Sequence, residues 1–122
     1  MSSTFVNIIE NDASTRRALQ RLFRSAGFRS ESFCCVDDFL NSDIPHSPTC
    51  VVTDVHMPGT SALQLPKLLA ARGINIPVIF VTADYSDATR DNIREAGGCG
   101  YFKKPVDDQA LIDMVRWSTV AD

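Results

Sequence analysis

The sequence predicts an α/β fold in which a five-stranded parallel sheet carries helices on both faces. Short segments rich in β-branched residues alternate with longer segments of helical period along the chain. Two of the short segments, CVVT at 50–53 and VIFVT at 78–82, contain no charged residue, which is typical of central strands buried on both faces. The alternation indicates parallel pairing, because successive parallel strands need a crossover connection between them.

The predicted elements follow one another as pairs of a strand and a helix. The strands are expected at 5–9, 30–34, 50–53, 78–82 and 100–102. The helices are expected at 13–26, 36–41, 61–72, 86–96 and 107–119. No linker interrupts this order. The 122 residues, 44% of them apolar, therefore predict a single domain over 1–122 with a substantial core.

Residue patterns support the first and third helices. In the first helix, apolar side chains recur at i, i+3, i+4 and i+7, at Leu19, Leu22, Phe23 and Ala26. Asp12 is a favourable N-cap for this helix, and Gly27 is expected to end it. In the third helix, Ser61 and Gln64 have the spacing of a capping box, although Pro66 falls where it can distort the first turns.

Two other helices have weaker signals. Cys35 precedes the second helix and offers a poor N-cap, so this short helix is expected to fray. The helix at 86–96 has few apolar anchors, chiefly Ala88, Ile93 and Ala96. Weak anchoring suits a surface that rearranges.

Composition narrows the function. A net charge of −3 and a pI near 5.2 argue against direct binding of nucleic acid or anionic membranes. The absence of a signal-like leader and of a long apolar run predicts a cytoplasmic protein. The cysteines lack paired metal-ligand spacing and lie in or beside apolar runs, so they are expected to be reduced and to serve packing. They are Cys34, Cys35, Cys50 and Cys99.

Polar groups gather where the predicted strands end, the edge at which open parallel sheets bind ligands. They are Glu10, Asn11, Asp12, Asp54, Thr82 and Lys104. Helix capping explains Asp12. It does not explain Asp54, which closes an apolar strand and is followed by the turn VHMPG. The sequence therefore predicts a functional site that combines carboxylates, a hydroxyl and an ammonium group.

Three motifs at these positions resemble one family. VVTDVHMPG, IPVIFVTA and YFKKP, at their mutual spacings, are similar to the response regulator receiver domain of two-component signalling. The resemblance implies a flavodoxin-like (βα)5 three-layer sandwich with strand order 2-1-3-4-5. INIPVIFVTA is most similar to regulators with a C-terminal helix-turn-helix domain, which implies transcription regulation. The chain is then either a stand-alone receiver or part of a longer regulator whose output domain is absent or was removed.

The resemblance also implies roles for individual residues. Asp54 matches the phosphoacceptor, which takes a phosphoryl group from a sensor histidine kinase. Lys104 matches the lysine that pairs with the phosphoryl oxygens, and Pro105 the proline whose cis peptide helps orient it. Thr82 matches the hydroxyl that turns toward the phosphoryl group, and Tyr101 the aromatic switch residue that moves inward with it.

A magnesium site is implied as well, with one departure from the family pattern. Its ligands would be Glu10, Asn11, Asp54 and the backbone carbonyl of His56. Asn11 stands where the family usually has an aspartate, so the site is expected to hold Mg²⁺ less well. Two hypotheses follow. Either Asp54 is phosphorylated despite the weaker metal site, or the chain is an atypical receiver that binds partners without phosphorylation.

The resemblance also implies residues that set the lifetime of the phosphoryl group and a surface that transmits the signal. His56 and Asp84 occupy positions that the family uses to tune this lifetime, and they could pair with each other. The alternative for His56 is an ordinary exposed loop residue. The helices at 86–96 and 107–119, with the strand at 100–102, match the surface that receivers use for dimerisation or effector docking.

Two readings from other classes are weaker. A magnesium-dependent phosphohydrolase with Asp54 as nucleophile would normally have a second aspartate two residues later, where His56 stands. A nucleotide-binding protein would need a glycine-rich loop after the first strand, and ENDAS contains no glycine. The chain is therefore not expected to be an enzyme.

Overall fold

The computed structural model describes residues 4–44, 48–84 and 86–119. Its strands are β1 (Phe5–Ile9), β2 (Arg29–Phe33), β3 (Thr49–Asp54), β4 (Val78–Thr82) and β5 (Gly100–Lys103). They form one parallel sheet in the order β2-β1-β3-β4-β5. The predicted fold class and strand order are confirmed.

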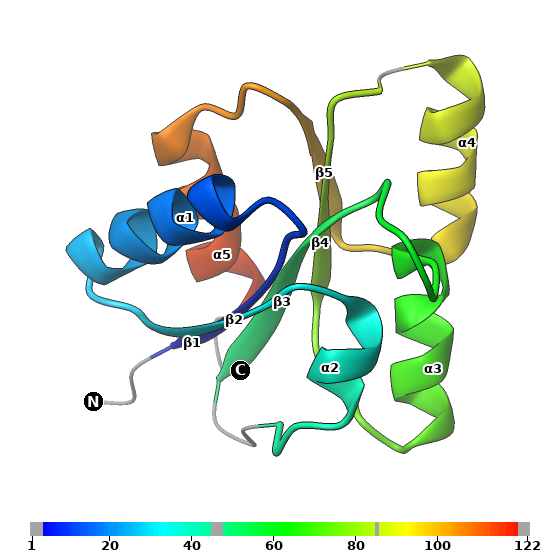
Figure 1. Cartoon of the computed structure of the whole chain (residues 1–122), viewed down its shortest axis with the longest axis horizontal. Helices are drawn as coiled ribbons and strands as arrows, with labels where there is room; N and C mark the ends of the chain where they lie inside the picture. Colours follow the sequence, from blue (N-terminus) through cyan, green and yellow to red (C-terminus); the bar gives the residue numbers. More distant parts are fainter. Residues whose placement is uncertain (1–3, 45–47, 85, 120–122) are drawn as a thin grey trace.

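Helices cover both faces of the sheet. They are α1 (Ala13–Ser25), α2 (Val36–Leu40), α3 (Leu65–Ala71), α4 (Asp87–Ala96) and α5 (Asp108–Ser118), with the short 3₁₀ helix η1 (Ala62–Gln64) before α3. In Figure 1, α1 and α5 lie together on one side of the sheet, and α2, α3 and α4 lie on the other. This is the predicted three-layer sandwich.

Each face of the sheet has its own apolar core. Under α1 and α5, Phe23 and Leu111 pack with Val52 of the central strand β3. Under α2, α3 and α4, the cluster includes Phe39 and Leu69. The central strands supply both cores because successive side chains of a strand point to opposite faces.

Helix ends follow the predicted capping chemistry where the sequence supplies a side-chain oxygen. Asp12 accepts a 2.8 Å hydrogen bond from the backbone N–H of Thr15 and so caps α1. Gly27, just beyond the helix, has a φ of +89°, which glycine adopts without a steric penalty. Cys35, at the N-cap of α2, makes no side-chain capping hydrogen bond.

The predicted third helix is divided in two. A continuous α-helix from Ser61 would need a bond from the N–H of residue 66 to the carbonyl of Ala62, and Pro66 has no N–H. Leu65 donates to Ala62 instead, which makes the first turn a 3₁₀ helix. Ser61 caps this turn through a 3.2 Å bond from the N–H of Leu63.

Other expectations need correction. The four cysteines are free, but only Cys50 is buried, and burial raises the pKa of its thiol to about 12. Cys34 and Cys99 are exposed, so they do not serve packing. In α4 the expected anchor Ala88 is exposed, and the buried residues are Thr89 and Ile93.

Among residues 4–44, 48–84 and 86–119, no helix has the length and apolar character needed to cross a membrane.

Candidate functional site

The predicted site residues meet at the carboxyl edge of the sheet. Asp54 and Thr82 are the last residues of the neighbouring strands β3 and β4, and Asp54 lies opposite Val81 in their register. Glu10 follows β1 and Lys104 follows β5. Parallel pairing of all strands brings these ends to one edge, although Glu10 and Lys104 are 94 positions apart in the chain.

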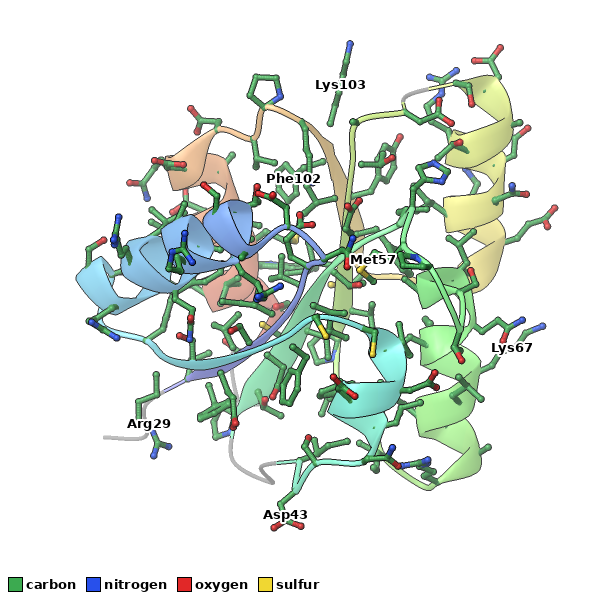
Figure 2. All side chains as sticks on the ribbon, viewed as in Figure 1. Arg29, Asp43, Met57, Lys67, Phe102 and Lys103 are labelled. Carbon is green, nitrogen blue, oxygen red and sulfur yellow. The ribbon has the colours of Figure 1, made fainter. Side chains whose placement is uncertain are left out.

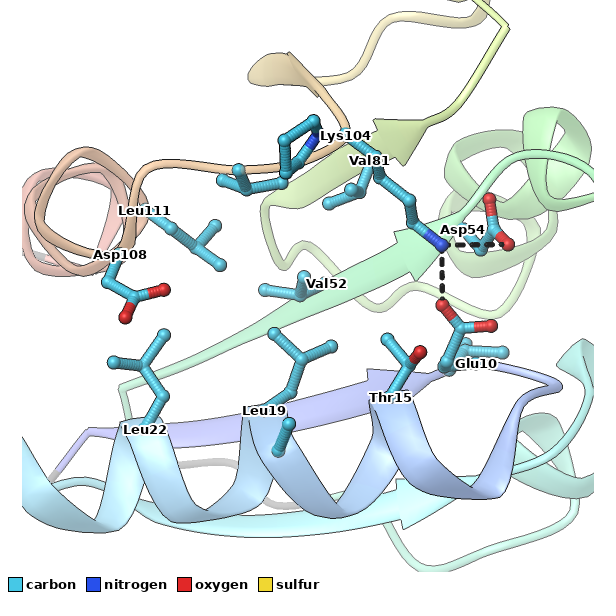
Figure 3. A pocket seen from close by; sticks show the side chains of 14 residues that line it. Glu10, Thr15, Leu19, Leu22, Val52, Asp54, Val81, Lys104, Asp108 and Leu111 are labelled. Atoms are coloured by element: carbon cyan, nitrogen blue, oxygen red, sulfur yellow. Dashed lines mark hydrogen bonds and ion pairs between the residues drawn. The ribbon is translucent and has the colours of Figure 1, made fainter.

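Lys104 connects the two carboxylates of the site. Its Nζ donates a 2.8 Å hydrogen bond to Oε1 of Glu10 and a 3.3 Å bond to Oδ2 of Asp54 (Figure 3). Glu10 is nearly buried, with 4% of its side chain exposed, against 15% for Asp54 and 28% for Lys104. Lys103, in contrast, points away from the fold in Figure 2. Lys104 thus faces the two carboxylates.

Backbone contacts position Lys104, and the neighbouring carboxylates favour its protonated form. Its N–H donates to the carbonyl of Thr82 at 2.8 Å, and the peptide bond to Pro105 is cis, as predicted. Burial alone would lower the pKa of the Lys104 ammonium group. The hydrogen bond that Lys104 donates to Glu10 and the charge of Asp54 outweigh burial and raise this pKa above its usual value. Lys104 is therefore a fixed positive charge beside Asp54.

Glu10 is held on both carboxylate oxygens. Oε2 accepts a 3.1 Å bond from the backbone N–H of Asp12, while Oε1 faces the lysine. Asn11, between them, is exposed, and Arg16 donates to the backbone carbonyls of Glu10 and Asn11 at 2.8 and 3.2 Å. Because its carboxylate caps α1 through Thr15, Asp12 is not placed to replace the missing charge at Asn11.

The donor set fits a hard divalent cation. Two carboxylates, from Glu10 and Asp54, already converge on the single ammonium group of Lys104. The resemblance implies two further ligands, the amide of Asn11 and the backbone carbonyl of His56, which would also supply oxygens, the donors that Mg²⁺ prefers. The set has one carboxylate fewer than an aspartate at position 11 would give, and its two carboxylates are already paired with a lysine.

Thr82 and Asp84 form a second network beside Asp54. Thr82 is buried, and its hydroxyl accepts from the N–H of Asp84 and donates to its carbonyl, both at 3.1 Å. The Asp84 carboxylate accepts bonds from the Thr89 hydroxyl at 2.8 Å and the Ser86 N–H at 3.0 Å. These bonds, the one from Thr89 foremost, lower the pKa of Asp84. Nε2 of His56 lies 3.4 Å from Oδ2 of Asp84, so the predicted pairing is present.

Thr89 is a site residue that sequence reasoning missed. It lies in α4, is buried, and binds both Asp84 and the helix N-cap Ser86. The only sequence signal was a threonine three residues after a serine N-cap, which is too common to single out. Tyr101, on β5, is half-buried and packs against the core under α2, α3 and α4.

A cavity of about 520 Å³ adjoins the site between α1, α5 and the sheet. Figure 3 shows Leu19 and Leu22 of α1 facing Leu111 of α5 across it, with Lys104 and Glu10 at one end. The lysine thus rests its aliphatic stem on an apolar wall while its ammonium group reaches the carboxylates, the usual arrangement for a half-buried lysine.

The three-layer fold and this edge of charged groups define a receiver-type signalling domain, and comparison with known proteins agrees. The response regulator receiver domain family matches residues 6–116, so the chain belongs to this family. The resemblance inferred from the three motifs is confirmed. The chain is a receiver domain of a two-component response regulator related to transcriptional regulators.

Two relatives show the relationship in sequence. Nodulation protein W of Bradyrhizobium diazoefficiens is 35% identical over 121 residues, which cover 99% of this chain and 53% of that protein. The transcriptional regulatory protein FixJ of Azorhizobium caulinodans is 35% identical over 113 residues, covering 93% of this chain and 54% of FixJ. The chain thus spans about half the length of these relatives.

Solved structures agree with the fold. The response regulator StyR superposes with a TM-score of 0.86 at 34% identity, covering 97% of this chain and 60% of StyR. FixJ-N superposes with a TM-score of 0.86 at 25% identity, covering both chains completely.

Proposed function

We propose that this receiver domain is phosphorylated on Asp54 by a sensor histidine kinase and that phosphorylation controls a transcription regulator. The observation that carries the proposal is the placement of Lys104, whose ammonium group bonds to both Asp54 and the nearly buried Glu10. A carboxylate that must accept a phosphoryl dianion needs fixed positive charge beside it.

In the proposed reaction, a carboxylate oxygen of Asp54 attacks the phosphorus of a phosphohistidine. The oxygen–phosphorus bond forms while the nitrogen–phosphorus bond breaks, and the bonding pair returns to the imidazole nitrogen. Lys104 stabilises the charge of the transferred group. Magnesium, held by Glu10, Asn11, Asp54 and the His56 carbonyl, would supply further positive charge to offset the repulsion between carboxylate and phosphoryl group.

The proposed switch begins at Thr82. Its hydroxyl is bonded to the backbone of Asp84, in the loop that leads to α4. On phosphorylation the hydroxyl would turn to the phosphoryl oxygens and release this loop, and Tyr101 would move toward the space that Thr82 leaves. The surface formed by α4, β5 and α5 would then change and serve dimerisation or effector control.

A second candidate function is partner recognition without phosphorylation. It is favoured by Asn11, which removes one charge from the metal site, and by the pairing of both remaining carboxylates with Lys104. A site already neutralised in this way holds a divalent cation less strongly. In that case Asp54 and Lys104 would serve as a structural ion pair.

Phosphorylation of the purified domain by a small phosphodonor distinguishes the phosphorylated receiver from the receiver that binds partners without phosphorylation. The chain would be incubated with acetyl phosphate and Mg²⁺ and its intact mass measured, next to Asp54→Asn and the matched control Asp113→Asn, an exposed aspartate on α5. We expect the mass of one phosphoryl group on the parent and on Asp113→Asn, and none on Asp54→Asn. Equal labelling of parent and Asp54→Asn, or none on any of the three, would overturn phosphorylation at Asp54.

A further inference from the structure

Two cysteines and an aspartate form a cluster at the start of α2. Cys34 directly follows β2, Cys35 is the N-cap of α2, and Asp38 lies in its first turn. Their sulfur and carboxylate oxygen atoms all lie within 4.8 Å of one another. Within 4–44, 48–84 and 86–119, no other group of three histidine, cysteine or acidic side chains meets at such distances.

The cluster is already assembled by local contacts. Sγ of Cys34 donates a 3.2 Å hydrogen bond to Oδ2 of Asp38. This bond, followed by burial, the charge of Asp38 and the neighbouring Cys35 thiol, raises the pKa of Cys34. Cys35 has extended backbone angles, with φ −156° and ψ 165°, and its thiol makes no bond to the helix N-terminus. Both sulfurs thus lie within 4.8 Å of the Asp38 carboxylate oxygen.

We propose that Cys34, Cys35 and Asp38 bind a borderline-soft divalent cation such as Zn²⁺. Two thiolates and a carboxylate are ligands that Zn²⁺ accepts, and a three-ligand protein site leaves the fourth tetrahedral position to water. Thiolates select such cations over Mg²⁺, which needs oxygen ligands. On binding, each thiol loses its proton to solvent, two sulfur–metal bonds form, and no oxidant or reductant is required.

The distances suit this coordination. Zinc–sulfur bonds of about 2.3 Å place two sulfurs of a tetrahedral site about 3.8 Å apart. The cluster lies within 4.8 Å, and Cys34 and Asp38 are exposed, so small side-chain rotations close the site without moving the core. The cation would replace the proton that Cys34 now shares with Asp38.

The proposed zinc site is separate from the edge that holds Asp54, but a hydrogen bond links the two regions. Asp37, next to Asp38, accepts a 2.8 Å hydrogen bond from the hydroxyl of Thr60, in the loop that follows Asp54. A cation that fixes the first turn of α2 would therefore also restrain this loop. The inference does not depend on phosphorylation of Asp54.

Cadmium is a direct probe, because Cd²⁺ bound to thiolates gives an ultraviolet charge-transfer band. The full chain would be titrated with Cd²⁺ under a phosphine reductant, and Zn²⁺ affinity measured by competition with a chromophoric chelator. The variants are Cys34→Ser, Cys35→Ser and Asp38→Asn, with Cys99→Ser as the matched control because Cys99 is also exposed. Asp54→Asn tests whether the cation binds at the phosphoacceptor edge instead of at the cysteines.

We expect one equivalent of Cd²⁺ with a band that Cys99→Ser and Asp54→Asn retain. Cys34→Ser and Cys35→Ser should each lose about half of the band and weaken Zn²⁺ binding at least about tenfold, and Asp38→Asn should weaken binding while keeping the band. Absence of saturable binding by the parent, an unchanged band in both cysteine variants, or loss of the band in Cys99→Ser would overturn the proposal.

Discussion

Asn11 lowers the negative charge around the proposed magnesium site by one unit. We predict that Asn11→Asp binds Mg²⁺ more tightly, because a charge-assisted contact contributes about 1.5–3 kcal/mol, or about one to two decades in affinity. Amide NMR titration with Mg²⁺ measures this. Asn75→Asp is the matched control, since Asn75 is exposed and precedes β4, at the opposite edge of the sheet. Equal affinities for parent and Asn11→Asp would show that position 11 does not contact the ion.

Lys104 compensates the charge of a nearly buried carboxylate. We predict that Lys104→Met lowers the free energy of unfolding by about 1–3 kcal/mol, because Glu10, only 4% exposed, loses its partner. Urea unfolding measures the loss. The double variant Glu10→Gln/Lys104→Met should recover part of it, since the uncompensated charge is gone. A double variant no more stable than Lys104→Met would contradict this account.

The same ion pair predicts a pH window. The folded-state pKa of Lys104 is raised, so its stabilising contribution is fully present below the unfolded pKa of about 10.4 and is lost as the pH rises through the folded value. The difference in unfolding free energy between parent and Lys104→Met should therefore be constant from pH 7 to about 9 and narrow only above about pH 10. If the difference in unfolding free energy narrows between pH 7 and 9, the stabilisation comes from the titration of a group other than Lys104.

His56 follows Asp54 by two residues, and its Nε2 lies 3.4 Å from Oδ2 of Asp84. We predict that His56→Ala shortens the lifetime of phosphorylated Asp54 about two- to fivefold, because the imidazole that pairs with Asp84 no longer shields the phosphoryl group from water. Loss of the phosphoryl group would be followed by intact mass after removal of the phosphodonor. Equal lifetimes would leave His56 as an ordinary loop residue.

At the scale of elements, α2 is the helix with the clearest defect. Cys35 gives its N-terminus no side-chain hydrogen bond, whereas Asp12, Ser86 and Asp107 cap α1, α4 and α5. We predict that Cys35→Ser stabilises the fold by about 1 kcal/mol, measured by urea unfolding. Cys99→Ser, which touches no helix N-terminus, should change stability little. If Cys35→Ser is stabilising, its loss of metal binding cannot be attributed to unfolding.

The sequence predicted the elements because their signals are local. Apolar period, the Asp12 cap and the breaker Gly27 depend on neighbours in the chain, and Pro66 marked the position where the third helix divides. Ala88 was misassigned because a ten-residue helix with so few apolar residues has a poorly defined buried face. Thr89 is buried there instead, held by its bond to Asp84.

The candidate site was predicted only in part, because its contacts join distant segments. The predicted strand order placed Glu10, Asp54 and Lys104 at one edge of the sheet. It did not predict that Lys104 donates hydrogen bonds to both carboxylates. The cysteines were misjudged for a related reason. Adjacent residues at a strand–helix junction have no fixed mutual orientation in the sequence, and the turn into α2 decides that Cys34 and Cys35 meet Asp38.

For the whole molecule, the proposed switch depends on how weakly α4 is attached. Only Thr89 and Ile93 of α4 are buried, and the loop before the helix is bonded to the Thr82 hydroxyl. Breaking those two bonds therefore frees the backbone of the loop that leads into the helix. A change at Asp54 can reach the α4-β5-α5 surface through this connection. In contrast, α1 packs Phe23, Leu22 and Leu19 into the core under α1 and α5, so it should stay in place.

We therefore predict that beryllofluoride with Mg²⁺, a stable mimic of the phosphoryl group, shifts the NMR signals of Tyr101 and α4 much more than those of α1. Sedimentation velocity should then show a larger dimer fraction. Trp117, the sole tryptophan and 72% exposed on α5, reports whether that helix is covered, since its emission moves to shorter wavelength on burial. Asp54→Asn should show none of these changes. Shifts confined to Asp54 and Lys104, with Tyr101 and sedimentation unchanged, would mean that the site binds the mimic without switching, because the bonds from Thr82 to Asp84 then hold the loop in both states.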